Sequence, residues 1–410
     1  MNNSTCNFDI LFLGGVFNEK KIIKESKSNV QFAANALQWN IIEGLDLINS
    51  HPINLLNAVF IGSYPSFYKK AIIKRNDWSH VEGANDIDVN FLNIPILKKF
   101  SRGWSLSREI KNWVNIKDER KKVIIAYSMD YSILRALKTA KASQSAITTC
   151  LVVPDLPQFM NLTSTEKASY KFLKKLEIKM INSLQHYVDS YVLLTKQMAD
   201  TLKLQNKPYV VVEGMVNIKE QVKPHILKES GKKSDLKTIL YTGSLNEKYG
   251  ILDLLMAFEL IDKENYRLQI CGTGETEKEI KEMAKRDSRI EFYGRVSREE
   301  AMKLQKKATV LINPRNSKGE YTKYSFPSKL MEYLVSGVPT IAYKLPGMPE
   351  EYNDYIYFIN GNSLNSITNT LIRVCEKSPN ELMEFGDKAR NYVLSEKNNM
   401  KQVEKIISLF

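Results

Sequence analysis

The sequence predicts an α/β protein of two doubly wound, Rossmann-like domains that face a central cleft. Three observations favour this fold class. Short apolar runs alternate with amphipathic stretches of helical period, the chain has 410 residues, and the alternation restarts after a polar, lysine-rich stretch at 219–237. We therefore expect a first domain over residues 1–225, a linker over 226–237, a second domain over 238–385 and, over 386–410, helices that pack back toward the first domain.

The first half contains five apolar runs that we interpret as buried strands, with helices between them. The expected strands cover residues 8–13, 58–61, 123–126, 147–153 and 191–194, and the expected helices cover 29–47, 131–141, 170–184 and 196–204. The helix over 170–184 is basic and amphipathic, with an apolar face formed by Phe172, Leu173, Leu176, Met180 and Leu184. It is either a packing helix with a solvated rim or a helix that contacts a membrane surface.

The second half repeats the alternation. The expected strands cover 238–242, 266–271, 290–293, 309–313, 340–342 and 357–359, and the expected helices cover 251–260, 275–286, 298–307 and 327–335, before the chain ends in helices. In open α/β sheets, ligands bind beyond the carboxyl ends of the strands. Two such domains that face each other would therefore place a ligand cleft between them.

Basic residues are concentrated in the first half. Residues 1–225 hold 30 Lys and Arg against 20 Asp and Glu, whereas residues 226–410 hold 29 against 26. This excess of positive charge favours binding of an anionic surface or ligand, although a role in solubility alone would also account for it. No apolar run reaches the roughly 18–20 residues that span a bilayer. The N-terminus lacks the basic segment of a signal peptide, so we expect a cytoplasmic protein.

The sequence contains no motif for several common kinds of site. The four cysteines lie far apart and none of the four histidines shows metal-ligand spacing, so we expect neither a disulfide framework nor a bound metal or cofactor. The absence of a GxxxxGK[ST] loop and of nucleic-acid-binding motifs argues against nucleic acid as a partner. The segment Asp86-Ile-Asp88 spells a metal-binding Asp-x-Asp. No matching sheet pattern surrounds it, and we interpret it as a solvated loop.

The most informative stretch is YSFPSKLMEYLVSGVP at 324–339. Pro327 suits the first turn of a helix, and Gly337 suits the residue just beyond its end. The N-terminus of such a helix binds anions, and Lys329 in its first turn is favourable when a phosphate sits there. Glu332 lies on the same face and can accept both hydroxyls of a ribose. The alternative is an ordinary surface pair between Lys329 and Glu332.

This stretch resembles the core of the retaining glycosyltransferases of family 4, which have the two-domain GT-B fold. In that family, an E-x7-E loop and helix leading into a small-Gly-x-Pro turn binds a nucleotide sugar. Glu332, Gly337 and Pro339 match this pattern, whereas Tyr324 stands where the first Glu is usual; the spelling FPSKLxEY resembles a subgroup that lacks this Glu. The resemblance implies that Glu332 binds the ribose. It implies that the diphosphate is held by the loop and helix start, Ser325, Phe326, Ser328 and Lys329.

A second segment, at 240–251, resembles the family's turn in which an Arg and a Lys clamp the diphosphate. Gly243 matches the turn, Ser244 stands where the Arg is usual, and Tyr249 stands where the Lys is usual. Lys248 is displaced by one position and could still reach a phosphate. The resemblance therefore implies donor contacts from Gly243, Ser244 and Lys248.

Three more segments resemble the family. Gly272 and Gly274 follow an expected strand and resemble the family's Gly-x-Gly, which lies near the nucleoside. Arg295 lies in a segment that resembles the one that contacts the base, so the resemblance makes it a candidate neighbour of the base. In the first half, Gly14 and Gly15 resemble the glycine pair after the first strand. Glycine there lets backbone N–H groups approach the diphosphate or the transferred sugar, although a plain tight turn would also use it.

Asp155 follows the strand at 147–153, at the place where many relatives have a His-Asp pair beside the reacting sugar. Pro154 replaces the His. The resemblance implies that the Asp155 carboxylate orients an acceptor hydroxyl or the sugar. The alternative is a turn that Asp155 forms before Pro157.

Together these segments imply a retaining glycosyltransferase that moves a sugar from a nucleotide-sugar donor, with UDP favoured, and needs no metal. Lys329 and Asp155 are the candidate catalytic residues. The implied acceptor is a glycan or a polyprenyl-diphosphate-linked oligosaccharide of capsule, exopolysaccharide or O-antigen synthesis. The basic first half adds the expectation of a peripheral enzyme at the inner, anionic face of a bacterial cytoplasmic membrane.

The sequence bears on three other classes of protein. A dinucleotide-dependent oxidoreductase would need a complete G-x-G-x-x-G with a ribose-binding acid about 20 residues later, and neither glycine turn provides it. A sugar-nucleotide epimerase of the same fold would need clustered acid and base residues, which the sequence does not show. A catalytically inactive glycan-binding or partner-stabilising subunit stays open, because Tyr324, Ser244 and Pro154 depart from the family pattern.

Overall fold

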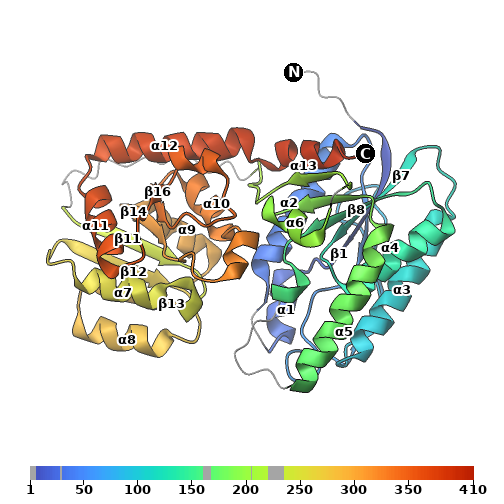
Figure 1. Ribbon diagram of the computed structural model, residues 1–410, viewed down its shortest axis with the longest axis horizontal. Helices are drawn as coiled ribbons and strands as arrows, with labels where there is room; N and C mark the ends of the chain where they lie inside the picture. Colours follow the sequence, from blue (N-terminus) through green and yellow to red (C-terminus); the bar gives the residue numbers. More distant parts are fainter. Residues whose placement is uncertain (1–5, 28–29, 160–167, 205, 220–234) are drawn as a thin grey trace. The chain divides into compact units, whose positions relative to one another are not determined.

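The computed structural model describes residues 6–27, 30–159, 168–204, 206–219 and 235–410 (Figure 1). It forms two compact units, each with its own sheet. Unit 1 comprises residues 1–213 and 399–410, and unit 2 comprises residues 214–398. The expected α/β class with two Rossmann-like units is confirmed.

Unit 1 is built on an eight-stranded sheet with the order β10-β9-β8-β7-β1-β2-β5-β4. Its pairs are parallel except for the antiparallel pair of β4 and β5 at one edge. The central strands are apolar along almost their whole length because helices cover both faces. The strands are β1 (Phe8–Gly14), β2 (Asn54–Asn57), β4 (Asn76–Trp78), β5 (Asp86–Asp88), β7 (Lys121–Tyr127), β8 (Thr148–Val153), β9 (Ser190–Leu193) and β10 (Tyr209–Val211), beside a separate pair, β3 (Ile72–Ile73) and β6 (Phe91–Leu92).

The helices of unit 1 form two groups. The long helices α3 (Leu97–Val114) and α5 (Ala168–Leu184) both pack on α4 (Tyr131–Ser143), whereas α2 (Phe32–Ile48) packs with α13 (Asn399–Ile407) (Figure 1). Crossovers that leave β1 in opposite directions put these groups on opposite faces of the sheet. Two short helices complete the unit, α1 (Glu19–Glu25) and α6 (Gln197–Leu202).

Unit 2 has a six-stranded, fully parallel sheet with the order β13-β12-β11-β14-β15-β16. Helix α7 packs with α8 and α11, and α10 packs with α9 and α12. The strands are β11 (Lys237–Thr242), β12 (Tyr266–Cys271), β13 (Ile290–Gly294), β14 (Val310–Asn313), β15 (Thr340–Ala342) and β16 (Tyr357–Phe358). The helices are α7 (Ile251–Glu259), α8 (Glu277–Arg286), α9 (Arg298–Lys307), α10 (Ser328–Ser336), α11 (Leu364–Cys375) and α12 (Pro379–Glu396).

Two local expectations are wrong. The apolar run at 58–61 is not a strand, because the strand that pairs with β1 is the preceding Asn54–Asn57. The run instead covers the glycine turn after β1, where the Phe60 ring fills the space beside Gly15. The Asp86–Asp88 segment is not a solvated loop, because it forms β5 and pairs with β2 and β4.

The chain passes from unit 1 to unit 2 after Glu213 and returns at Asn399. Most of the expected linker lies outside the described residues. Of the C-terminal helices expected over 386–410, α12 packs on α10 within unit 2, and α13 packs on α2 within unit 1. None of the helices that the structure describes is long and apolar enough to cross a membrane.

Candidate functional site

The predicted donor residues of unit 2 gather at one edge of its sheet. All six strands are parallel, so the turns that follow them lie at the carboxyl edge, where ligands of open α/β sheets bind. The residues that follow β11, β12, β13 and β14 at this edge are Gly243, Ser244, Lys248, Gly272, Gly274, Arg295, Ser325, Phe326, Ser328 and Lys329.

Helix α10 starts at this edge with an uncapped first turn. Pro327 occupies the N-cap position and makes no side-chain cap hydrogen bond, and the first N–H groups of a helix lack intrahelical partners. Phe326, just before it, is buried and packs on the Tyr352 ring at a centroid distance of 5.2 Å. The Phe326 side chain therefore anchors the turn, while exposed Ser328 and half-exposed Lys329 stand at the helix start.

Lys329 and Glu332 form an ion pair, and Gln305 of α9 donates a hydrogen bond to the same carboxylate. The Lys329 Nζ lies 2.9 Å from Glu332 Oε2, and the Gln305 Nε2 donates to Glu332 Oε1 at 2.6 Å. Burial raises the pKa of Glu332, but the charge of Lys329 and the hydrogen bonds from Lys329 and Gln305 outweigh it and lower the pKa. Glu332 is thus held as a carboxylate in one orientation, and the buried Gln305 is a positioning residue that the sequence did not reveal.

Arg315, which follows β14, is a second residue that no motif indicated. Its guanidinium lies over the rings of Tyr249 and Tyr321, 5.4 and 5.1 Å from their centroids, and its Nη2 donates to Ser325 Oγ at 2.9 Å. The Nε is buried and has no hydrogen-bond partner among the described residues. Arg315 therefore places a positive charge beside the loop that leads into α10.

The turn after β11 lies against Arg315. The Tyr241 hydroxyl donates to the Ser244 carbonyl at 2.7 Å, which fixes the start of the turn, and Lys248 is exposed beside the Tyr249 ring. Gly250 has a φ of +78°, and a Cβ there would lie 2.2 Å from the Pro314 carbonyl oxygen. This close approach brings Tyr249 next to Arg315, since Pro314 immediately precedes it.

The glycines after β12 pack against the backbone of the turn after β11. A Cβ on Gly272 would lie 1.8 Å from the Gly243 carbonyl oxygen, and one on Gly274 would lie 2.1 Å from the Leu245 carbonyl oxygen. The Gly274 N–H donates to Glu277 at 3.2 Å. Close packing therefore explains why glycine stands at both positions, in addition to their predicted role in donor binding. Arg295 is exposed in the turn after β13.

In unit 1, Gly14 is the last residue of β1 and Gly15 follows it, and both are buried. The Gly15 N–H donates to Gln38 Oε1 at 2.8 Å, and a Cβ on Gly15 would lie 2.1 Å from the Phe60 ring. The glycine pair thus lets Phe60 and Gln38 close over the strand end. In this arrangement the Gly15 N–H is already engaged, so a ligand that uses it would have to replace Gln38.

Asp155 is exposed just beyond the end of β8, at the carboxyl edge of the unit 1 sheet. Burial, together with the nearby charge of Asp155, raises the pKa of Tyr127 at the end of β7.

Arg102 of α3 donates to Asp130 at 3.1 Å and lies over the Phe60 ring, 5.5 Å from its centroid. Burial lowers the pKa of Lys98, one turn earlier, to about 7. These cationic side chains had no signal in the sequence.

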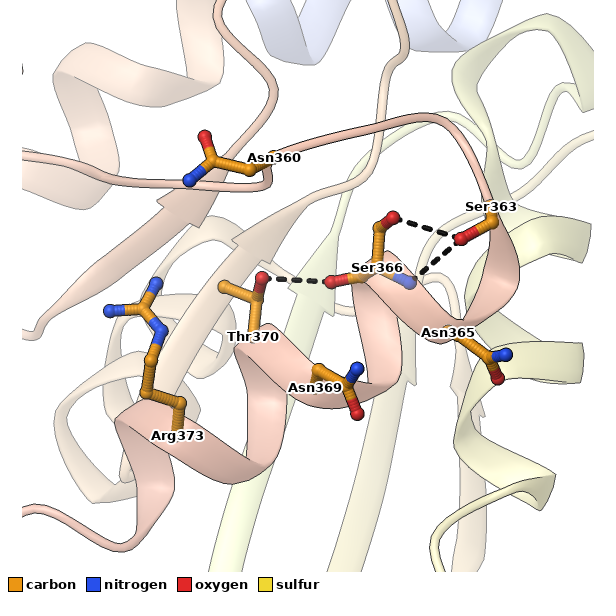
Figure 2. Close-up of a pocket in the computed structure, with 7 residues that line it drawn as sticks. All are labelled: Asn360, Ser363, Asn365, Ser366, Asn369, Thr370 and Arg373. Carbon is orange, nitrogen blue, oxygen red and sulfur yellow. Dashed lines mark hydrogen bonds between the residues drawn. The ribbon is translucent and has the colours of Figure 1, made fainter.

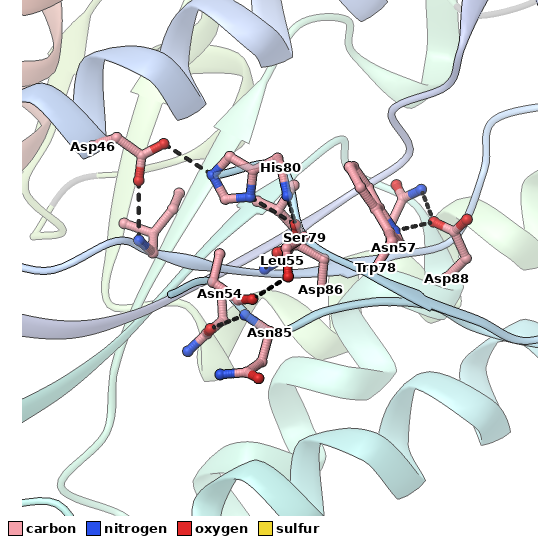
Figure 3. Close-up of polar contacts among 12 residues, drawn as sticks. Asp46, Asn54, Leu55, Asn57, Trp78, Ser79, His80, Asn85, Asp86 and Asp88 are labelled. Atoms are coloured by element: carbon pink, nitrogen blue, oxygen red, sulfur yellow. Dashed lines mark hydrogen bonds and ion pairs between the residues drawn. The ribbon is translucent and has the colours of Figure 1, made fainter. Parts of the chain in front are cut away.

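His80 is not isolated, although its spacing in the sequence indicated no partner. Figure 3 shows its ring between two carboxylates, with Nε2 at 2.9 Å from Asp46 and Nδ1 at 2.7 Å from Asp86. Asp86 also accepts from the Leu55 N–H at 2.9 Å, so this cluster ties α2 to the strands β2 and β5. Burial lowers the pKa of His80, but the two carboxylates outweigh it and raise the pKa to about 9.

A polar hollow lies at the start of α11 and is separate from the residues described above. Figure 2 shows side chains from the preceding turn and from the helix around it, with the Ser363 hydroxyl accepting from the Ser366 N–H at 3.1 Å. None of the predicted site residues lines it. Its lining consists of Asn360, Ser363, Asn365, Ser366, Asn369, Thr370 and Arg373.

Solved structures of similar fold were found over nearly the whole chain. Sucrose-phosphate synthase from Thermosynechococcus elongatus has a TM-score of 0.65 at 14% identity, with 98% of each chain covered. The apo form of the lipopolysaccharide outer core galactosyltransferase WaaB has a TM-score of 0.64 at 15% identity, with 98% of this chain and 99% of that chain covered. A UDP-forming α,α-trehalose-phosphate synthase from Burkholderia xenovorans, solved with glucose-6-phosphate, has a TM-score of 0.66 at 10% identity, with the same coverage.

These neighbours define the fold as GT-B, the two-unit architecture of many sugar transferases. Within it, residues 222–392 match the family model described as glycosyl transferases group 1. Among proteins with curated functions, no match to the sequence was found. This match spans the 240–251 and 324–339 segments, in which the sequence resembles glycosyltransferases.

Proposed function

We propose that this protein is a retaining glycosyltransferase that moves a sugar from a UDP-sugar to a glycan or polyprenyl-diphosphate-linked acceptor in capsule, exopolysaccharide or O-antigen synthesis. The observation that carries the proposal is the cluster at the carboxyl edge of the unit 2 sheet. There an uncapped helix start carries Lys329, which pairs with Glu332, a carboxylate that Gln305 orients. Arg315 donates to Ser325 in the loop that leads into this helix.

In the proposed complex, the diphosphate lies at the start of α10. Lys329 turns from Glu332 toward the phosphates, and Glu332 accepts the ribose hydroxyls. The guanidinium of Arg315 supplies the positive charge that Ser244 and Tyr249 do not, because a guanidinium can donate to phosphate oxygens. The two flanking tyrosine rings hold it in place.

The chemistry follows from this charge distribution. Breaking the bond between the anomeric carbon and the phosphate oxygen moves negative charge onto the diphosphate. Fixed N–H donors and two cations stabilise that charge without a metal ion. The acceptor hydroxyl attacks from the same face, its proton passes to the departing diphosphate, and the products are the glycoside and UDP. No protein nucleophile is required, and Asp155 would orient the acceptor from unit 1.

The neighbours support the coarse features of this proposal. The trehalose-phosphate synthase is described as UDP-forming, and WaaB as a transferase of the lipopolysaccharide outer core. The group 1 domain covers the segments to which we assign the donor. A glycan acceptor at a membrane is also consistent with the excess of basic residues in the first half.

The proposal is tested by incubating the protein with UDP-, GDP- and dTDP-sugars and measuring the released nucleotide. We expect release of UDP, and we expect Lys329→Ala to lower it by about 10²–10³-fold, as for loss of one donor to a developing oxyanion. Lys303→Ala, in the exposed i,i+4 pair of α9, is the matched control and should leave the rate unchanged. Near-normal turnover in Lys329→Ala would contradict the assignment. Tight UDP binding without any release would favour the inactive glycan-binding subunit instead.

A further inference from the structure

Helices α3 and α5 present a surface of large apolar side chains to solvent. On α3, Trp104 is 58% and Phe100 is 46% exposed, and on α5, Phe172 is 62% and Leu173 is 53% exposed. The exposed α5 side chains are four of the five residues of the apolar face that the sequence pattern indicated; the fifth, Leu184, is buried. We name this the α3/α5 surface, and it comprises Ile96, Leu97, Phe100, Trp104, Phe172, Leu173, Leu176 and Met180.

The two helices are linked to each other. Both pack on α4 (Figure 1). Lys99 of α3 also makes an ion pair with Glu177 of α5. On α3 the exposed residues Leu97, Phe100 and Trp104 follow helical spacing, while Leu106 and Ile110, further along the helix, are buried. Single exposed apolar residues are normal, but several large ones on each of two linked helices indicate an interaction surface.

Basic side chains border this surface. The exposed Lys175 and Lys179 lie on α5, and the exposed Arg108 and Lys111 lie on α3, with Arg108 over the Trp104 ring at 5.4 Å from its centroid. The acidic residues of the two helices are already paired, Glu177 with Lys99 and Glu109 with Arg75 and Arg108. The border therefore carries a net positive charge.

The place of the surface in unit 1 is informative. Helix α3 leads into β7 and α5 leads toward β9, so the C-terminal end of each helix lies at the amino edge of the sheet. Their N-terminal halves, which carry the aromatic residues, lie toward the carboxyl edge, where Asp155 also lies and where ligands of this fold class bind.

We infer that the α3/α5 surface docks on a bilayer that contains anionic phospholipids. The aromatic and aliphatic side chains enter the headgroup boundary, and the lysines and arginine face the lipid phosphates. Exposed aromatic side chains within a border of net positive charge are complementary to the apolar and anionic layers of such a bilayer. The inference deepens the proposed lipid-linked acceptor, because it places the acceptor edge of unit 1 at the membrane, but its test needs no sugar transfer.

The test is flotation of the full chain with phosphatidylcholine vesicles, with and without phosphatidylglycerol, at physiological ionic strength. We expect binding only with phosphatidylglycerol and weaker binding at high salt. Two variants probe the two components of the surface. Lys175→Glu with Lys179→Glu should weaken binding roughly tenfold or more, because each lysine near an anionic surface contributes severalfold. Phe100→Ser with Phe172→Ser should weaken it comparably.

Matched controls come from unit 2. Lys278→Glu with Lys285→Glu reverses two exposed lysines of α8 and changes the net charge equally, and Leu260→Ser removes an apolar side chain that is 52% exposed. Both should bind like the wild type. Absence of wild-type binding, or equal losses in the controls, would overturn the inference. So would a concentration-dependent dimer that the Phe100/Phe172 variant abolishes, because a second copy would then be the occupant. UDP release, measured separately, reports on the proposed function alone.

Discussion

Arg315 and Lys329 reach the proposed diphosphate position from different elements. Lys329 belongs to the first turn of α10, whereas Arg315 follows β14 and meets that turn through Ser325. In the family pattern, the comparable charge comes from the turn after the first strand of the domain, where this chain has Ser244 and Tyr249. In the proposed site, Arg315 thus supplies the charge that Ser244 and Tyr249 do not.

We predict that Arg315→Ala lowers the rate of UDP release by about 10²–10³-fold, since one charged donor to the leaving diphosphate is lost. Arg315→Lys should recover only part of the rate, because an ammonium cannot donate in the planar, two-pronged manner of a guanidinium. The measurement is kcat/KM for each variant, with the exposed Arg373→Ala as control. Equal rates for Arg315→Ala and Arg373→Ala would remove Arg315 from the site.

Neither Arg315 nor Gln305 could be predicted from the sequence. A motif is read from residues at fixed spacing, and these side chains reach Ser325 and Glu332 only because parallel strands bring separate turns to one edge. Lys329 and Glu332 were predictable, because both lie in one helix turn with proline before it and glycine after it.

At the level of elements, the carboxyl edge of unit 2 is built by close backbone packing. Gly272 has a φ of +149° and its position against the Gly243 carbonyl leaves no room for a side chain. Gly294 has a φ of +64°, but nothing lies within 4 Å of where its Cβ would be. The first glycine thus joins two turns, whereas the second only adopts a left-handed conformation.

We predict that Gly272→Ala lowers the free energy of unfolding by about 3 kcal/mol or more. The alanine Cβ would displace the Gly243 carbonyl, and residue 272 would also keep a backbone conformation that is strained for alanine. Gly294→Ala should cost only about 1 kcal/mol, the usual strain of a left-handed residue with a Cβ. Urea unfolding followed by circular dichroism measures both. Similar losses of unfolding free energy in the two variants would show that the close contact with the Gly243 carbonyl does not determine the cost of the substitution.

The Asp46–His80–Asp86 cluster gives unit 1 a pH-dependent stability. The pKa of His80 is raised to about 9 in the folded state, above its usual value of about 6.5. Stabilisation of about 3 kcal/mol is therefore present in full below pH 6.5 and is lost as the pH rises through 9. We predict that His80→Gln removes this dependence. Unfolding free energies at pH 6 and above pH 9 test it, and an equal pH dependence in wild type and variant would contradict it.

The alternation of strands and helices predicted both sheets because buried parallel strands read as apolar runs. The errors lie where that signal fails. β2 contains two asparagines, and the longer apolar run after it covers a turn instead. β5 consists of Asp-Ile-Asp, whose carboxylates bind His80, Trp78 and Asn57 inside the fold. Partners that are distant in sequence make these polar strands possible, and a single sequence does not show them.

At the scale of the whole molecule, unit 1 is completed by a distant segment of chain, whereas unit 2 is contiguous. Helix α13, from the C-terminus, packs on α2 of unit 1, where Gly44 leaves room for Val403 and the Asn399 carbonyl. Unit 1 therefore depends on residues that follow all of unit 2.

We predict that Val403→Ala destabilises unit 1 by about 2 kcal/mol, because Val403 is fully buried. The four tryptophans, at positions 39, 78, 104 and 113, all lie in unit 1, so their fluorescence reports on its unfolding. The exposed Glu404→Ala is the control and should leave the transition in place. An unchanged fluorescence transition in Val403→Ala would show that α13 is not needed for the stability of unit 1.

Hydrogen–deuterium exchange with and without UDP is the most direct test of the donor site in unit 2. Bound UDP should slow exchange in peptides that cover residues 243–250 and 313–332, because the nucleotide occupies the N–H groups at the start of α10 and orders the turn beside Arg315. The N–H groups of unit 1 should change much less. Slower exchange confined to unit 1, or none anywhere at saturating UDP, would contradict the placement of the nucleotide and, with it, the mechanism built on Lys329 and Arg315.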